Sequence, residues 1–313
     1  MIVDLPDTTT SAISKALVKI REEGGAVALG RVLTLIISTG SEDAAEAAIA
    51  AANDASREHP MRLIVLAASE TRDGESVGAR LDAEIRVGGD AGASEVIVLR
   101  AWGPLAATEE SLVTGLLLPD APVVVWWPVL APENPANSPL GRIAQRRITD
   151  VSEHEHPLDS LHDLIATYQS GDTDFAWTRL TLWRSQLAAV LDQPPFSPIT
   201  AASVTGSLES PATVLMAAWL RLQLNVPVEC HLDPVEAELG GISQVTLTRE
   251  NGEVVLHRDQ PSTALLSQPG QPTHRIALPR RSLRDCLADE LRRLGPDHTF
   301  GRVLADGLPL VQP

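Results

Sequence analysis

The side chains best suited to metal or acid–base chemistry lie in one short stretch, residues 152–163. Its polar members are Ser152, Glu153, His154, Glu155, His156, Asp159, His162 and Asp163. Histidines and carboxylates at short spacing can bind a transition metal, and the candidate ligands are His154, His156 and His162. The stretch lacks the histidine pair around a glutamate that makes a zinc-protease motif specific. It therefore favours an acidic loop in which Asp159 caps the next helix, and we expect no metal or other cofactor.

Other reactive groups are isolated in the sequence. Cys230 and His231 are adjacent in a strand-like run, and adjacent strand residues point to opposite faces, so they cannot act together as nucleophile and base. The glycine-rich run 88–92 has the wrong spacing for a dinucleotide fingerprint and reads as a loop. The two cysteines, Cys230 and Cys286, form no metal or redox pattern and are typical of reduced core thiols. There is no phosphate-loop or nucleophile-elbow motif, so we expect a protein that is not an enzyme.

Tryptophan and arginine gather instead in residues 174–188, although aromatic residues make up only 3% of the chain. These two residue types are enriched at the energetic centres of protein–protein interfaces. One helical stripe there is apolar, and it consists of Ala176, Leu180, Trp183, Leu187 and Val190. Trp183 is therefore expected in the core, where Arg179 could stack on it. Trp177 and Arg184 are expected on an exposed face with Thr181. We predict that Trp177, Arg179 and Arg184 bind a partner; a purely packing role is the alternative.

A second tryptophan pair ends the apolar run 123–127. On a strand the side chains of Trp126 and Trp127 point to opposite faces, and Pro128 ends the strand. Ligands of open α/β sheets bind beside the carboxyl ends of the strands. We therefore expect one of the two tryptophans in the core and the other at a surface cleft or contact, and both join the candidate partner-binding residues.

The charge of the chain restricts its partners. With 313 residues and a formal net charge of −16, the protein has no excess of lysine and arginine for a nucleic-acid backbone or an anionic membrane. The charge favours a partner with a basic patch. No apolar run approaches the length that spans a bilayer, and the N-terminus does not have the pattern of a signal peptide. We expect a cytoplasmic protein, and the sequence does not predict its oligomeric state.

The elements that must position these residues alternate between helices and strands. In the first half we expect helices at 8–23, 41–56, 109–118 and 158–168, and strands at 31–38, 62–67, 81–87, 95–99 and 121–127. In the second half we expect helices at 174–191, 211–223 and 283–294, and strands at 199–205, 226–232, 243–248, 253–257, 263–266 and 274–278. This order predicts two three-layer α/β domains, residues 1–170 and 171–313, with mostly parallel sheets that carry antiparallel edge strands. The similar order of the two halves also fits a diverged duplication.

Four segments resemble the glucose-6-phosphate dehydrogenase assembly protein (OpcA) family. They are residues 3–9 (VDLPDTT), 30–35 (GRVLTL), 122–128 (PVVVWWP) and 177–184 (WTRLTLWR). The segments fall in both halves of the chain. The resemblance implies a non-catalytic partner that promotes assembly or activation of glucose-6-phosphate dehydrogenase. It supplies no catalytic residues, so the partner-binding residues named above rest on their chemistry.

The alternative is a sugar-phosphate- or nucleotide-binding α/β enzyme or a metabolite sensor. Its cleft would lie at the strand ends near Trp127, with Arg142, Arg146 and Arg147 as phosphate contacts. The pattern favours a solvated helix face for these three arginines over a phosphate site.

Overall fold

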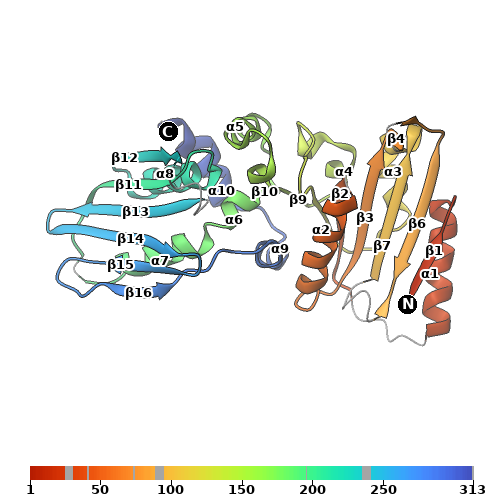
Figure 1. The fold of residues 1–313 in the computed structure, drawn as a ribbon, viewed down its shortest axis with the longest axis horizontal. Helices are drawn as coiled ribbons and strands as arrows, with labels where there is room; N and C mark the ends of the chain where they lie inside the picture. Colours follow the sequence, from red (N-terminus) through yellow and green to blue (C-terminus); the bar gives the residue numbers. More distant parts are fainter. Residues whose placement is uncertain are drawn as a thin grey trace. The chain divides into compact units, whose positions relative to one another are not determined.

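The computed structural model describes residues 1–24, 31–40, 42–72, 75–88, 95–194, 196–234 and 241–311 (Figure 1). They form two compact units. Unit 1 comprises residues 1–150, 171–173 and 282–296, and unit 2 comprises residues 151–170, 174–281 and 297–313. The chain therefore crosses between the units several times. The predicted domain boundary between residues 170 and 171 stays a prediction.

Unit 1 is built on an eight-stranded sheet. Its strands are, in spatial order, β1 (Ile2–Leu5), β6 (Arg80–Arg86), β7 (Glu95–Trp102), β3 (Met61–Ser69), β2 (Leu33–Thr39), β8 (Val123–Trp126), β9 (Arg146–Thr149) and β10 (Asp172–Asp174). The five strands from β7 to β9 are parallel, whereas β6 pairs antiparallel with both β7 and β1. Every residue of β2 is buried, as is typical of a central strand covered on both faces. A separate small sheet joins β4 (Thr71–Arg72) to β5 (Glu75–Ser76).

Helices cover this sheet. They are α1 (Thr10–Gly24), α2 (Glu42–Ala55), α3 (Glu109–Thr114), α4 (Pro139–Arg142) and α9 (Leu283–Arg292). Ile13 and Leu17 of α1 and Val113 of α3 share one core with Ile64 of β3 and Trp127. Helix α2 contacts β2 and β3, and α9 packs on α2. Unit 1 is thus completed by a helix that lies far along the chain from the sheet.

The strand β9 corrects the interpretation of two arginines. Arg146 and Arg147 were expected on a solvated helix face, or as phosphate contacts, but both are buried in β9. Arg146 Nε donates to Glu290 Oε2 of α9 at 3.1 Å, and its Nη1 donates to Gly295 O at 2.6 Å. Arg147 forms a buried ion pair with Asp172. The sequence signal failed because these carboxylates lie 144 and 25 residues away from their respective arginines.

Unit 2 contains a six-stranded sheet. Its strands are, in spatial order, β12 (Val228–Asp233), β11 (Ile199–Ser207), β13 (Ile242–Arg249), β14 (Gly252–Gln260), β15 (Thr263–Ser267) and β16 (His274–Ala277). Only β11 and β12 pair in parallel among these strands, and the remaining pairs are antiparallel. The α/β class is confirmed, but the mostly parallel order holds for the first sheet alone. Short turns such as Glu250–Asn251, which joins Arg249 of β13 to Gly252 of β14, connect neighbouring strands and so make them antiparallel.

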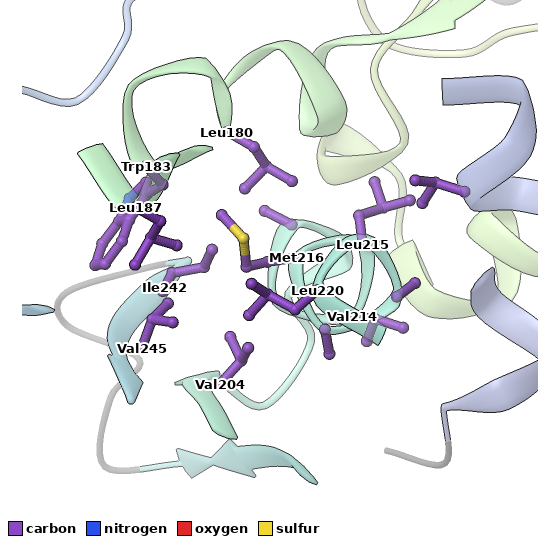
Figure 2. Close-up of a cluster of buried hydrophobic side chains, with 14 of the residues drawn as sticks. Leu180, Trp183, Leu187, Val204, Val214, Leu215, Met216, Leu220, Ile242 and Val245 are labelled. Atoms are coloured by element: carbon purple, nitrogen blue, oxygen red, sulfur yellow. The ribbon is translucent and has the colours of Figure 1, made fainter. Parts of the chain in front are cut away.

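The helix α8 (Pro211–Leu224) forms the centre of unit 2. Ser210 caps it by accepting from Thr213 N, and Pro211 occupies its first position. Figure 2 shows Leu215, Met216 and Leu220 of α8 among side chains from the sheet and from residues 180–187. Close approach of helix and strand requires Gly206, because a Cβ there would lie 2.1 Å from Thr213 Oγ1.

The remaining helices of unit 2 are α5 (Pro157–Thr167), α6 (Phe175–Thr178), α7 (Thr181–Leu191) and α10 (His298–Arg302). One turn of π-helix, Val303–Gly307, and a 3₁₀ turn, Leu308–Leu310, follow α10. Phe300, Val303 and Leu304 of this C-terminal segment are buried in the same core as α8.

The Arg146→Met variant should lower the free energy of unfolding by about 3–5 kcal/mol, because it leaves the Glu290 carboxylate buried without its cation. Arg142→Met is the matched control: Arg142 is exposed and pairs with Glu110 at 3.1 Å, so its loss should cost less than about 1 kcal/mol. Urea unfolding of both variants measures the difference. Equal destabilisation would show that the buried pair has no special role, and Arg146→Met/Glu290→Met should recover much of the loss.

Candidate functional site

The predicted helix 174–191 is interrupted at residues 179–180, which separate α6 from α7. Asp174 caps α6: its Oδ1 accepts from Ala176 N at 2.7 Å and its Oδ2 accepts from Val151 N at 3.0 Å. One carboxylate therefore begins the helix and also holds the segment at 151. All five residues of the predicted apolar stripe are nevertheless buried in one core, so the stripe is confirmed although the helix is interrupted: they are Ala176, Leu180, Trp183, Leu187 and Val190.

The Trp177 ring belongs to an aromatic cluster in unit 2. It is 1% exposed and stacks on Phe300 with ring centres 5.6 Å apart, and Phe300 meets Tyr168 edge-on at 5.9 Å. The indole Nε1 donates to Asp297 Oδ2 at 2.8 Å. The exposed face predicted for Trp177 is therefore wrong. The indole has both an aromatic neighbour and a hydrogen-bond acceptor inside the unit, which is the usual requirement for burying tryptophan.

Arg184 lies over the Trp177 ring with its guanidinium carbon 3.6 Å from the ring centre. Its side chain is half-buried, as is that of Arg179 at the break between the helices. A guanidinium at this distance is held by the electrostatic attraction of the ring face. The Trp177 ring thus holds the Arg184 guanidinium in place. Of the three predicted partner-binding residues of this segment, Arg179 and Arg184 are the ones that solvent reaches. Their role in binding a partner stays a prediction.

Trp183 is 4% exposed and belongs to the core, as predicted. Figure 2 shows it beside Leu187, with Ile242 and Val245 of β13 nearby. Arg258, from β14, places its guanidinium carbon 5.3 Å from the centre of the Trp183 ring. The sequence did not indicate this contact, because the two residues lie on elements that are far apart in the chain.

A pocket of about 360 Å³ opens in unit 2 beside Trp183. Its charged lining residues are Glu153, Arg179, Glu209, Arg258, Arg280 and Arg281. Sequence reasoning singled out Arg179 alone among the arginines. The available signal was the run Pro279-Arg280-Arg281 after the last strand, but nothing in the sequence showed that it meets Arg179.

Both residues of the tryptophan pair in unit 1 are buried. Trp126 is 0% exposed and Trp127 is 3% exposed, so the expected division into one core and one surface tryptophan is wrong. The reason is that the sheet continues past β8: Trp127 N donates to Ile148 O of β9 at 3.0 Å. The exposed apolar residues at this strand end are Val129, 43% exposed, and Leu130, 78% exposed. A partner-binding role for the two tryptophans stays a prediction.

The histidines do not converge. His154 Nδ1 lies 2.8 Å from Ser160 Oγ, His162 Nδ1 lies 2.9 Å from Leu158 O, and His156 is exposed. Among the residues that the structure describes, no three histidine, cysteine or carboxylate side chains are placed to hold a metal ion. The predicted cap is wrong: His156 occupies the N-cap of α5, and Asp159 lies in the first turn, where its charge complements the helix dipole.

Cys230 and His231 point to opposite faces of β12, as predicted: the thiol is buried, and the exposed imidazole lies 3.2 Å from Glu229. Burial raises the pKa of the Cys230 thiol to about 11. A thiol that remains protonated at neutral pH is a poor nucleophile. Of the glycine run 88–92, Gly88 has φ +75°, and residues 89–92 lie outside the described residues.

Family comparisons cover most of the chain. Residues 52–166 match the family model for the N-terminal domain of the glucose-6-phosphate dehydrogenase subunit. Residues 170–304 match the family model for the C-terminal domain of the same subunit. No curated protein sequence matches the chain.

Among solved structures, a 3-ketoreductase from Actinomadura kijaniata in complex with NADP, KijD10, is 10% identical, with 89% of this chain and 96% of that chain covered and a TM-score of 0.45. Glucose-6-phosphate 1-dehydrogenase from Mycobacterium avium is 11% identical, with coverages of 90% and 93% and a TM-score of 0.45. An oxidoreductase from Thermotoga maritima is 13% identical, with coverages of 88% and 94% and a TM-score of 0.40. Similarities at this level establish neither a shared fold nor a shared activity.

Within the described parts of the chain, no helix has the length and apolar character needed to cross a bilayer.

Replacing Trp177 should show how much the aromatic cluster stabilises unit 2. Trp177→Ala removes the stacking and the Asp297 hydrogen bond, so we expect a loss of about 3–5 kcal/mol in urea unfolding. Trp177→Phe keeps a ring and should lose about 1–3 kcal/mol through the unpaired Asp297 acceptor. Phe196→Ala, at a residue that is 74% exposed, is the control and should change stability by less than about 0.5 kcal/mol. A Trp177→Ala variant as stable as this control would contradict the structural role.

The Cys230 thiol should react roughly 100-fold more slowly with iodoacetamide at pH 8 than an exposed cysteine, because its raised pKa leaves little thiolate. Peptide mapping by mass spectrometry can follow the two cysteines separately. Since the folded pKa lies above the ordinary value of 9.0, the stability from the neutral thiol is complete below pH 9 and is lost as pH rises through about 11. Rapid labelling of Cys230 at pH 8 would disprove its buried, protonated state.

Proposed function

The chain belongs to the glucose-6-phosphate dehydrogenase assembly protein family, and we propose that it is a non-catalytic partner that assembles or activates this dehydrogenase by direct binding. The observation that carries the proposal is the match of two consecutive family models, which together extend from residue 52 to residue 304. Both models are named for a subunit of that enzyme. Both cysteines are buried thiols, which is in keeping with the cytoplasmic location that forms part of the proposal.

The proposed contact surface lies on the outer side of the α6–α7 segment. Arg184 and Arg179 offer planar guanidinium donors to carboxylates or carbonyls of the partner. Arg184 is held at 3.6 Å over Trp177, and this fixes its position before binding. An arginine with restricted motion loses less conformational entropy on forming an interface. In this proposal the buried tryptophan acts through the arginine above it.

An activator must bind the active form of its target more tightly than the inactive form. The shift that this protein causes in the equilibrium between inactive and active dehydrogenase would then be set by the difference between its affinities for the two forms. Assembly and activation can follow from the same selective binding. If the dehydrogenase is active only as the complete oligomer, a protein that binds this oligomer selectively stabilises it and so raises the activity.

The arginines of the alternative function are engaged elsewhere. Arg146 is paired with Glu290 and Arg147 with Asp172, both in buried ion pairs, and these carboxylates occupy the donors that a phosphate would need. A sugar-phosphate site built on Arg142, Arg146 and Arg147 therefore has less support than the partner role.

The proposal predicts that the purified protein raises the rate of its own organism's glucose-6-phosphate dehydrogenase and co-elutes with it in size-exclusion chromatography with light scattering. Arg184→Ala should raise the concentration for half-maximal activation by about tenfold, since it removes a charge-assisted contact. Arg302→Ala, which removes an exposed arginine of α10, should leave activation unchanged. The melting temperature of each variant must match that of the wild type.

Absence of both a rate change and a complex would remove the support for a partner role. If Arg184→Ala and Arg179→Ala activate the dehydrogenase as well as the wild type does, the partner role is retained and the contact lies on another surface.

A further inference from the structure

The pocket of unit 2 is lined by a buried arginine, Arg258, whose positive charge is fixed in place. Arg258 is 4% exposed, and its Nη1 donates to Pro261 O at 2.9 Å and to Leu278 O at 2.8 Å. These neutral carbonyls orient the guanidinium without neutralising it. Within the described residues Arg258 has no carboxylate partner, unlike the buried Arg146 and Arg147 of unit 1.

A second guanidinium adds to this charge. Arg280 lines the same pocket from the exposed segment after β16. Burial, together with the positive charge of Arg280, lowers the pKa of Arg258 from its usual value. The two cations therefore repel each other, and an anion between them would relieve that repulsion.

The N-terminus of α8 opens at the same place. Ser210, Pro211 and Ala212 line the pocket at the start of this 14-residue helix. Pro211 has no N–H group and Thr213 N donates to Ser210, so α8 contributes mainly its dipole, which favours a negative charge at this end. Arg179 and Arg281 complete the ring of donors, with Arg281 Nη1 also donating to Thr178 O at 3.0 Å.

We propose that this pocket binds the phosphate group of a small phosphate monoester, with Arg258, Arg280, Arg179 and the first turn of α8 around the phosphate. Planar guanidinium groups match phosphate oxygens in pairs. The pocket shares Arg179 with the partner surface proposed above, but phosphate binding can be measured on this protein without the dehydrogenase.

The rest of the lining narrows the class of ligand. Leu180, Trp183 and Ile242 supply an apolar wall, and about 360 Å³ is enough for a small metabolite. The exposed carboxylates of Glu153 and Glu209 also line the pocket. They can accept hydrogen bonds from hydroxyl groups and would repel further phosphates. The lining therefore favours a hydroxylated monophosphate over a nucleotide with a chain of phosphates.

The test uses the full-length protein alone, in calorimetric titrations with inorganic phosphate, glycerol 3-phosphate and glucose 6-phosphate. Glucose and ADP are the comparison ligands. We expect at least one monophosphate to bind with a dissociation constant of about 1 mM or lower, and glucose and ADP to bind at least about tenfold more weakly. Arg280→Ala and Arg179→Ala should each weaken that binding by about tenfold. Arg302→Ala is the matched control and should bind like the wild type.

Arg280 is exposed, so its removal tests the pocket without disturbing the core, and melting temperatures verify this for each variant. The proposal is overturned if no monophosphate binds at concentrations up to about 10 mM. It is also overturned if ADP binds as tightly as the monophosphates, or if both arginine variants retain wild-type affinity. Because the dehydrogenase is absent from the experiment, failure here leaves the proposed partner role untouched.

Discussion

The buried ion pair between Arg146 and Glu290 is the interaction on which the architecture of unit 1 depends. It joins the strand β9, which extends the sheet beyond β8, to the helix α9, which packs on α2. A buried pair of charges is costly to desolvate and is retained only where the geometry satisfies both partners. Here the guanidinium also donates to Gly295 O, immediately after the helix. The pair therefore selects both the register of the strand and the position of the helix.

A similar arrangement holds for the next residue of β9. Arg147 is bound to Asp172, and the chain passes Gly171 with φ +101°, where a Cβ would lie 2.6 Å from Gln145 O. A side chain there would be strained in conformation and would also meet the backbone. Burial of polar groups in β9 and β10 is thus possible because charge pairs and one glycine fit together. Whether β9 and β10 are buried therefore depends on the residues that pair with them and cannot be read from their own amino acids.

This explains how far the sequence could predict the fold. The apolar runs of β2, β3, β7 and β8, the capped helix α8 and the hairpin at Gly252 carry local signals of burial, capping and turn geometry, and these elements were expected at nearly their observed positions. β9 was missed because RRIT looks like a surface segment until its carboxylates are known. β1 was missed because it is four residues long and pairs with β6, in which Arg86 is the partner of Ile2 and Ala83 the partner of Leu5. The tryptophans were correctly recognised as unusual, but whether an indole finds its acceptor inside the unit, as Trp177 does at Asp297, depends on residues 120 positions away. The arginine pocket combines residues from Ser152 to Arg281, and no local pattern could assemble it.

The chain order of the two units has a consequence for how the protein is made. Residues 282–296, including α9, belong to unit 1, although they are translated after almost all of unit 2. Domains generally fold as they leave the ribosome, N-terminal parts first. Unit 1 can acquire most of its sheet early, but the surface of α2 that receives α9 stays uncovered until unit 2 has emerged. Unit 1 can therefore be completed only after nearly the whole polypeptide, including α9, has been synthesised. A prematurely terminated chain without α9 presents an apolar surface to the chaperones and proteases that remove incomplete products.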